Sequence, residues 1–471
     1  MNELAGIGFA LRKLFDTKSV TSKFAGVLYA SFVTIGPVLA FILLLVLVHA
    51  GMWFFGIDEN TRLMFTTTIL YMMVSSVIIS CAINTVLSRF IAAQIYDGNN
   101  EKIRSSVIGS VSLAAVVSML AGMAFIYPMV AIYQLSLVYS VGLYLFLLMI
   151  SITFVLMAYI SAIKEYTKVA LAYFVGLLFG IAVFLLAYYW LGVPIEVGLI
   201  YGMAMTFFVI NIALFVLTRT FFKGKSTHSF EFLRFFKKHP ALFLSGLFYI
   251  LGLYAHNIIY WYFSNVSTKV MYLKILPSYD MATFLAMLIN LSAMVIFIVK
   301  VETSFYEKYQ GYVKNVGSAN YEEIERSRKN MNRVLDHELF FLYEVQLVIT
   351  IVLIALGMVF LPRFSFGGAV LDYYMVLGMA YYCSFCMYFT VVFLYYFDDQ
   401  RGAMITTLLF FAVTAAAGFV IANISPTYFA LALLIGALVS WIYGFNRLKS
   451  FIRNINRNLF CLNARFTEDK E

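Results

Sequence analysis

The sequence predicts an all-α polytopic membrane protein with about 12 transmembrane helices. Of its 471 residues, 63% are hydrophobic and only 12% are charged, whereas soluble domains carry about 25% charged residues. The apolar residues form runs of roughly twenty, the length that a helix needs to cross a hydrocarbon core. These runs do not alternate strictly, and backbone groups in lipid must bond internally, so we expect helices and not the strands of a barrel.

Twelve apolar segments are the expected spans. In chain order they are residues 24–48, 65–88, 107–132, 137–162, 170–191, 197–217, 241–263, 279–301, 340–361, 373–397, 404–423 and 428–445.

The basic residues orient these spans, because cytoplasmic loops carry an excess of Lys and Arg. With the N-terminus placed inside, only Arg62, Lys269, Lys274 and Arg363 of the 33 Lys and Arg residues fall in outside segments. A wrong number of spans would remove this asymmetry. The sequence therefore predicts an N-in/C-in topology, with both termini cytoplasmic.

A charged inside segment, residues 219–240, separates two sets of six spans. We expect residues 24–218 and 241–448 to form two six-helix bundles. An even set of spans that starts inside also returns inside, so the two bundles would be parallel repeats.

Three further cytoplasmic segments complete the domain prediction. Residues 1–23 are mildly amphipathic and are expected to form an interfacial helix. Residues 318–339 contain Glu325 and Lys329, four residues apart, which favours a solvated helix that leads into the following span. We expect that helix to be a docking surface or a spacer, and residues 449–471 to be a tail.

Three separated motifs resemble those of one transporter family. Tyr279–Tyr309 contains YDMATFLAML and VETSFYEKY, residues 5–15 read AGIGFALRKLF, and residues 395–403 read YYFDDQRGA. They resemble motifs of the PelG family, the inner-membrane transporter of the Pel exopolysaccharide system. The resemblance is spread over most of the chain.

The resemblance implies a MATE/flippase-like architecture, that of the multidrug/oligosaccharidyl-lipid/polysaccharide flippase superfamily. It also implies that the chain passes an amino-sugar exopolysaccharide across the bacterial cytoplasmic membrane. A cytosolic glycosyltransferase (the Pel-type synthase) and small membrane partners would complete the complex. Two alternatives stay open: a cation-coupled exporter or flippase of drugs or lipid-linked oligosaccharides, and a non-transporting scaffold that anchors a synthase.

The sequence shows no catalytic motif. It lacks a Gly-rich phosphate loop, metal-ligand spacing and a placeable Ser-His-Asp pattern, and it has five His residues. We therefore expect no enzyme activity, no cofactor, no metal and no nucleic-acid partner.

The span at 373–397 carries four tyrosines at intervals of seven residues: Tyr374, Tyr381, Tyr388 and Tyr395. Seven steps of a helix return to within about 20°, so the four rings share one face over roughly 32 Å. Rings with hydroxyl groups suit a sliding sugar chain, and we assign them to a transport path. The alternative is packing between helices.

Three polar residues are assigned to the same path. His256 and Asn257 lie in the outer third of the span at 241–263, and Asp280 begins the next span. The PelG family commonly has an acidic–basic pair at the positions of His256 and Asn257, and this chain does not. A neutral His beside a hydrogen-bonded Asn is therefore expected there.

Seven charged residues lie at the predicted cytoplasmic ends of the spans. They are Arg89, Lys300, Glu302, Glu344, Asp398, Asp399 and Arg401. Such a cluster is what an inner vestibule needs, and ordinary interfacial anchoring also produces it. We expect the two aspartates to meet Arg89 or Arg401, or to attract a cationic polymer.

Five other residues are unusual within the spans. Gly36 and Pro37 should kink the first span, as a moving hinge or as a static bend. Asn84, Asn211 and Asn290 are amides within the predicted spans, for which hydrogen bonds between helices are expected.

Overall fold

The computed structural model describes residues 42–163, 165–224, 228–297, 303–364 and 366–455. The predicted interfacial helix, the Gly36–Pro37 hinge and the pair Lys300 and Glu302 lie outside these residues.

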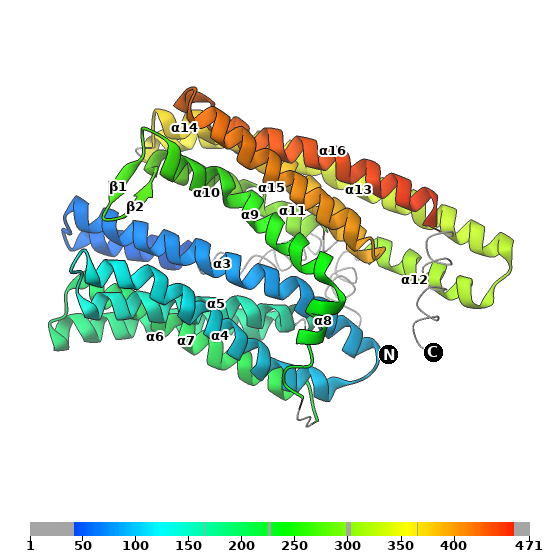
Figure 1. Cartoon of the computed structure of the whole chain (residues 1–471), viewed down its shortest axis with the longest axis horizontal. Coiled ribbons are helices and arrows are strands. Elements are labelled where there is room, and N and C mark those ends of the chain that lie inside the picture. Colours follow the sequence, from blue (N-terminus) through cyan, green and yellow to red (C-terminus); the bar gives the residue numbers. More distant parts are fainter. Residues whose placement is uncertain (1–41, 164, 225–227, 298–302, 365, 456–471) are drawn as a thin grey trace, which may run out of the picture. The chain divides into compact units, whose positions relative to one another are not determined.

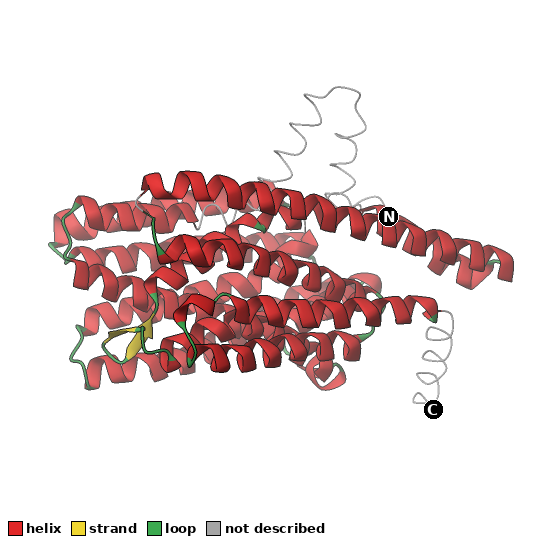
Figure 2. Cartoon of the chain, turned by 90° about the horizontal axis from the view of Figure 1, so that it is seen from above, coloured by secondary structure: helices red, strands yellow, loops and turns green. Residues whose placement is uncertain are grey.

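The helices confirm the predicted class. In the described part, 11 helices are long and apolar enough to cross a membrane. They match the predicted spans from 65–88 onward, while most of the first predicted span precedes residue 42. Apart from one small hairpin, the regular structure of the described residues is helical (Figure 2). The chain is therefore an all-α polytopic membrane protein.

By their internal contacts, the described residues divide into two compact units. The N-terminal unit runs to Tyr254 and also includes Tyr260–Leu276. The C-terminal unit consists of Ala255–Ile259 and the chain from Pro277 onward. Helix α9 (Pro240–Phe263) thus contributes to both units.

The N-terminal unit is a helical bundle with a hairpin (Figure 1). Besides most of α9, its elements are α3 (Glu59–Tyr96), α4 (Asn100–Ala131), α5 (Leu137–Ile163), α6 (Tyr166–Leu191), α7 (Ile195–Phe221), α8 (Leu233–Lys238), β1 (Thr268–Val270) and β2 (Leu273–Ile275). Helix α5 packs against α3, α4 and α7, and α7 also packs against α6.

Helices α6 and α7 approach closely through small residues. A Cβ atom on Gly180 would collide with Gly202 O and with the hydroxyl of Thr206. Van der Waals contact of this kind holds membrane helices together, because lipid offers no hydrophobic drive between them. The outward side chains of α6, such as Leu171 and Phe174, are apolar and exposed, as lipid contact requires.

Helix α3 begins after Asp58. The Asp58 carboxylate accepts a hydrogen bond from the backbone N–H of Thr61 at 3.0 Å, and this bond lowers the pKa of Asp58. The charged carboxylate therefore caps the positive end of the helix.

The C-terminal unit is built around α14 (Ala369–Tyr396). Its other elements are α10 (Pro277–Ile289), α11 (Leu291–Ile296), α12 (Thr303–Ser318), α13 (Tyr321–Phe360), η2 (Leu361–Phe364), α15 (Gln400–Ala422), η3 (Pro426–Tyr428) and α16 (Leu431–Arg453). Helix α14 contacts α10, α13, α15 and α16, so the tyrosine-rich span is the centre of this unit.

One predicted span is not continuous. The sequence predicted a single helix over 279–301, but α10 ends at Ile289 and α11 begins at Leu291. Asn290 between them has φ −90° and ψ 0°. The span itself is confirmed, but its helix is interrupted at Asn290, and the hydrogen bonds around that residue are described below.

Helix α13 runs through most of residues 318–339 and continues directly into the predicted span at 340–361, as the sequence predicts, while its cytoplasmic location stays a prediction. Its 40 residues reach about 60 Å, twice the hydrocarbon thickness. Its N-terminal half packs against α12, and the two extend past the end of α16 (Figure 1). Glu325 there pairs with Lys329 at 3.8 Å and also with Arg328.

Candidate functional site

The four tyrosines assigned to a transport path lie on one continuous helix, α14. Tyr374 is buried, its hydroxyl donates to Leu353 O on α13 at 3.0 Å, and its ring occupies the space that Gly357 leaves. This ring therefore has the packing role that was the alternative to sugar contact. Tyr381 is buried, and Tyr388 and Tyr395 are half-buried.

The neighbouring Tyr382 lies on the face of α14 that packs against α13. Its hydroxyl donates to Tyr343 O at 3.1 Å, and the Tyr343 hydroxyl lies 2.9 Å from Thr390 Oγ1. These bonds fix the rotation of α14 about its axis. The seven-residue spacing alone does not distinguish packing rings from accessible ones.

The structure brings together the three other residues assigned to the path. His256 Nδ1 lies 2.7 Å from the hydroxyl of Tyr279, and Asn257 Nδ2 donates to Asp280 Oδ1 at 2.8 Å. Consecutive residues of α9 thus meet consecutive residues of α10. Asn257 also lies 3.5 Å from Thr283 Oγ1.

The burial of these side chains differs. His256 and Asn257 are 0% and 3% exposed, whereas Asp280 is half-buried. The hydrogen bond from Asn257 holds the Asp280 carboxylate beside two buried polar groups. The prediction of a hydrogen-bonded Asn next to His256 is confirmed, and Asp280 is the bonding partner that the sequence did not identify.

The break between α10 and α11 is held by a polar network. Asn290 Oδ1 accepts from Gln346 Nε2 at 3.2 Å and from Thr350 Oγ1 at 3.1 Å. Asn290 Nδ2 donates to Gly378 O at 3.3 Å. Asn290 Nδ2 also lies 3.4 Å from Ala286 O, so the side chain serves a backbone carbonyl of α10 at the interruption, where lipid offers no water as a partner.

This network is buried and joins three helices. Asn290 and Thr350 are 0% exposed and Gln346 is 2% exposed. Ser292 donates to Gln346 Oε1 at 2.9 Å and so ties α11 to α13. Gln346, which lies within the predicted span at 340–361, is thus held beside Asn290.

All three span amides form hydrogen bonds between helices, as predicted. In addition to Asn290, Asn84 Nδ2 donates to Phe154 O at 2.8 Å. Asn211 donates to Met149 O at 2.8 Å and accepts from Thr153 Oγ1 at 2.8 Å. These last two amides hold α3 to α5 and α5 to α7.

Asp399 is paired with a residue that the sequence prediction missed. Its carboxylate accepts from Arg447 Nε at 2.6 Å and from Arg447 Nη2 at 3.1 Å, and it caps α15 by accepting from Gly402 N at 3.0 Å. The expectation of Arg89 or Arg401 as its partner is wrong. A basic residue near the end of the last predicted span was the available signal.

The other described residues of the charged cluster predicted at the cytoplasmic ends of the spans lie in different surroundings. Asp398 is exposed with a positive φ of 59°, and Gln400 donates to its carboxylate at 2.8 Å. Glu344 and Arg401 are exposed, and Arg89 is half-buried in the N-terminal unit. The structure therefore joins Asp399 to α16 and leaves an inner vestibule as a prediction.

The sequence matches one family model over almost its entire length. This model, described as "PelG: Putative exopolysaccharide Exporter (EPS-E)", covers residues 4–460. None of the curated proteins compared with the chain matches it.

Solved transporter structures share the fold. A MATE transporter in the straight conformation gives a TM-score of 0.63 at 14% identity, over 92% of this chain and 96% of that one. A multidrug resistance MATE family transporter of the MOP superfamily in an outward-facing conformation gives 0.56 at 14%, over 91% and 96%. A MOP superfamily transporter from Pyrococcus furiosus gives 0.56 at 15%, also over 91% and 96%. These likenesses show a MATE-like transporter fold.

Proposed function

Because the chain belongs to the PelG family, we propose that it passes a Pel-like amino-sugar polysaccharide across the cytoplasmic membrane while a cytosolic glycosyltransferase extends the polymer. The observation that carries this proposal is the family match over residues 4–460, on a fold shared with MOP-superfamily transporters. Small membrane partners would hold the synthase beside the chain.

The polar groups of the C-terminal unit support a path for sugars. Tyr388 and Tyr395 are half-buried on α14, and rings with hydroxyl groups are of the side-chain type that suits contact with sugars. Asp280, held by Asn257 at 2.8 Å, offers a carboxylate to a positively charged amino group. Rings and a single carboxylate suit an amino-sugar polymer better than an apolar drug.

The placement of the acidic residues supports passage driven by polymerisation. In the described part of α10 and α14, the acidic residues are Asp280 and Asp372, each in the first turn. A cation-coupled exporter needs a carboxylate that titrates deep within a span. Growth of the polymer at the cytosolic synthase would supply the driving force instead.

The cytoplasmic end of the C-terminal unit provides a surface for the synthase. Helices α12 and α13 form a hairpin beyond the spans, and Lys449 of α16 pairs with Asp336 at 3.0 Å to brace it. An extended, braced helix pair is suited to docking a cytosolic enzyme.

Thiol labelling at α14 tests the path. In cells that make the polymer, a cysteine at Tyr388 should react with a small water-soluble reagent, and polymer arrested in transit should protect it. A cysteine at Val376, which is also half-buried and lies about 120° away around the helix, is the matched control. Reaction at Val376 with an inert Tyr388 would place the path elsewhere.

The alternatives give different results in secretion assays. A cation-coupled exporter stops when the ion gradient is collapsed although polymer synthesis continues. A scaffold secretes normally when Tyr388 is replaced by Ala, provided that the protein accumulates. The proposal requires that secretion fail in the Tyr388→Ala variant and that it follow synthesis and not the ion gradient.

A further inference from the structure

The segment between α7 and α9 is a docked element of the N-terminal unit. A Cβ on Gly109 of α4 would collide with Ser229 O, so the absence of a side chain at Gly109 lets the segment pack closely against α4. Phe232 is 0% exposed and its ring lies 6.4 Å from that of Phe90 on α3. Lys102 of α4 pairs with the neighbouring Glu231 at 2.8 Å.

The opposite face of this segment is exposed and mixes basic with apolar side chains. Phe230 and Leu233 are 53% and 38% exposed. Arg234, Lys237 and Lys238 are also exposed, and among the described residues their side chains have no hydrogen-bond or ion-pair partner. We call residues 230–238 the basic–aromatic segment.

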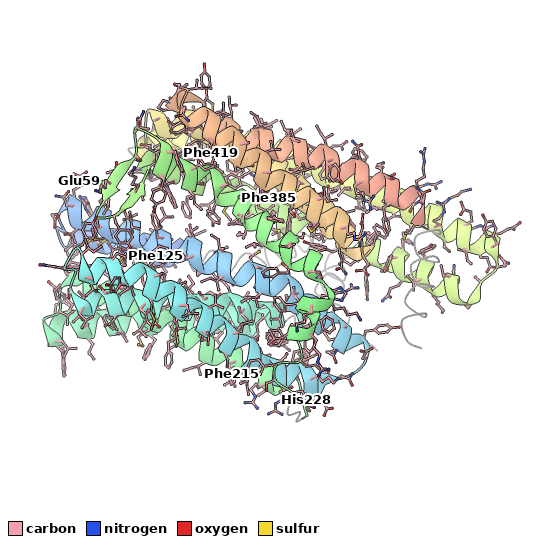
Figure 3. The ribbon with its side chains drawn as sticks, viewed as in Figure 1. Glu59, Phe125, Phe215, His228, Phe385 and Phe419 are labelled. Carbon is pink, nitrogen blue, oxygen red and sulfur yellow. The ribbon has the colours of Figure 1, made fainter. Side chains whose placement is uncertain are left out.

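The position of the segment places it at one end of the spans. It connects the end of α7 to the start of α9, and it lies next to His228, which Figure 3 shows at the end of the N-terminal unit opposite Glu59. Among the described residues, the other basic side chains at this end of the unit are Arg89, Lys102, Arg104, Lys168, Arg219 and Lys223.

We propose that the basic–aromatic segment binds the headgroups of anionic phospholipids in the bilayer that surrounds the chain. Cations beside exposed apolar groups are typical of segments in the plane of the interface: the apolar groups enter the acyl boundary and the cations meet phosphate. Phe230 and Leu233 would remain in water if the three cations met only a soluble acidic surface. This inference depends on the membrane fold and not on the transported substrate.

Photo-crosslinking of lipids tests the assignment. The full chain is reconstituted in vesicles that contain a photoactivatable phosphatidylglycerol or a photoactivatable phosphatidylcholine, and the yield on peptides spanning residues 228–240 is measured. In the wild type the phosphatidylglycerol yield should exceed the phosphatidylcholine yield. Each basic residue near an anionic surface contributes about a fivefold preference. In the variant Arg234→Gln, Lys237→Gln, Lys238→Gln, the ratio of the phosphatidylglycerol yield to the phosphatidylcholine yield should therefore fall at least about fivefold.

A charge-matched variant provides the control. Lys308→Gln, Lys314→Gln, Arg333→Gln removes three exposed basic residues from the α12–α13 hairpin, and it should keep the wild-type ratio. Arg234→Lys, which retains the charge, should also keep it, and high salt should lower it in the wild type. Thermal unfolding of each variant in detergent verifies its fold.

Equal yields of the two lipids in the wild type would overturn the proposal. So would a ratio that is unchanged in the Arg234, Lys237 and Lys238 variant, or one that falls equally in the control variant. If the first variant loses function in cells while its lipid ratio is unchanged, an acidic protein partner uses this surface and the lipid assignment is wrong.

Discussion

Replacing Asn290 with Leu should destabilise the C-terminal unit by removing the bonds that hold the break between α10 and α11. The Asn290 amide forms three hydrogen bonds to other helices: with Gln346, with Thr350 and with Gly378 O, at 3.2, 3.1 and 3.3 Å. Leu has a similar volume and forms none of them. The polar groups of Gln346 and Thr350 would stay buried next to an apolar side chain.

The expected loss follows from these bonds. A hydrogen bond between membrane helices contributes about 0.6 kcal/mol on average, so three of them correspond to about 2 kcal/mol. Asn84→Leu is the matched control in the N-terminal unit. Asn84 forms one such bond, to Phe154 O, and its Oδ1 has no hydrogen-bond partner among the described residues. That substitution should cost at most about 0.6 kcal/mol.

The assay is reversible unfolding in mixed micelles, in which titration with a denaturing detergent unfolds the protein and gives the free energy of unfolding. A double-mutant cycle with Thr350→Val isolates one bond, because this substitution removes the hydroxyl that donates to Asn290. The cycle should give a coupling free energy of about 0.6 kcal/mol. If Asn290→Leu costs no more than Asn84→Leu, or if the two changes are additive, the network does not hold the break.

Three further substitutions test separate features. Asp399→Asn weakens the pair with Arg447, and because that guanidinium is partly exposed the free energy of unfolding should fall by only about 1 kcal/mol, measured in the same micelles. Gly109→Ala forces a Cβ into the docked segment and should cost about 1–3 kcal/mol, whereas Gly311→Ala, with open space around it, should be neutral or stabilising. A cysteine at Ser318 should not react with an impermeant reagent added to intact cells, and labelling there would refute the predicted topology.

The spans were predictable because their signal is local. Lipid requires each crossing segment to satisfy its own backbone hydrogen bonds, so an apolar run of sufficient length is enough to identify a helix. The extension of α13 was also predictable, since Glu325 and Lys329 lie four residues apart on the same helix.

The candidate site was predictable only in part. The structure places on one helix the four tyrosines Tyr374, Tyr381, Tyr388 and Tyr395, as predicted. The first of them packs against α13, where its hydroxyl donates a hydrogen bond to Leu353 O. Spacing places side chains on one face, and it does not identify the neighbour of that face.

The sequence by itself determined which segments are helices long and apolar enough to cross a membrane, because hydrophobic length and backbone satisfaction depend on residues close together in the chain. Only the tertiary structure decided that the helix beginning at Pro277 breaks at Asn290. The reason is that the break is held by Gln346, Thr350 and Gly378 O, which are more than fifty residues away in sequence. Neither proline nor glycine marks the break, so its energy comes from partners that meet Asn290 only after the helices pack.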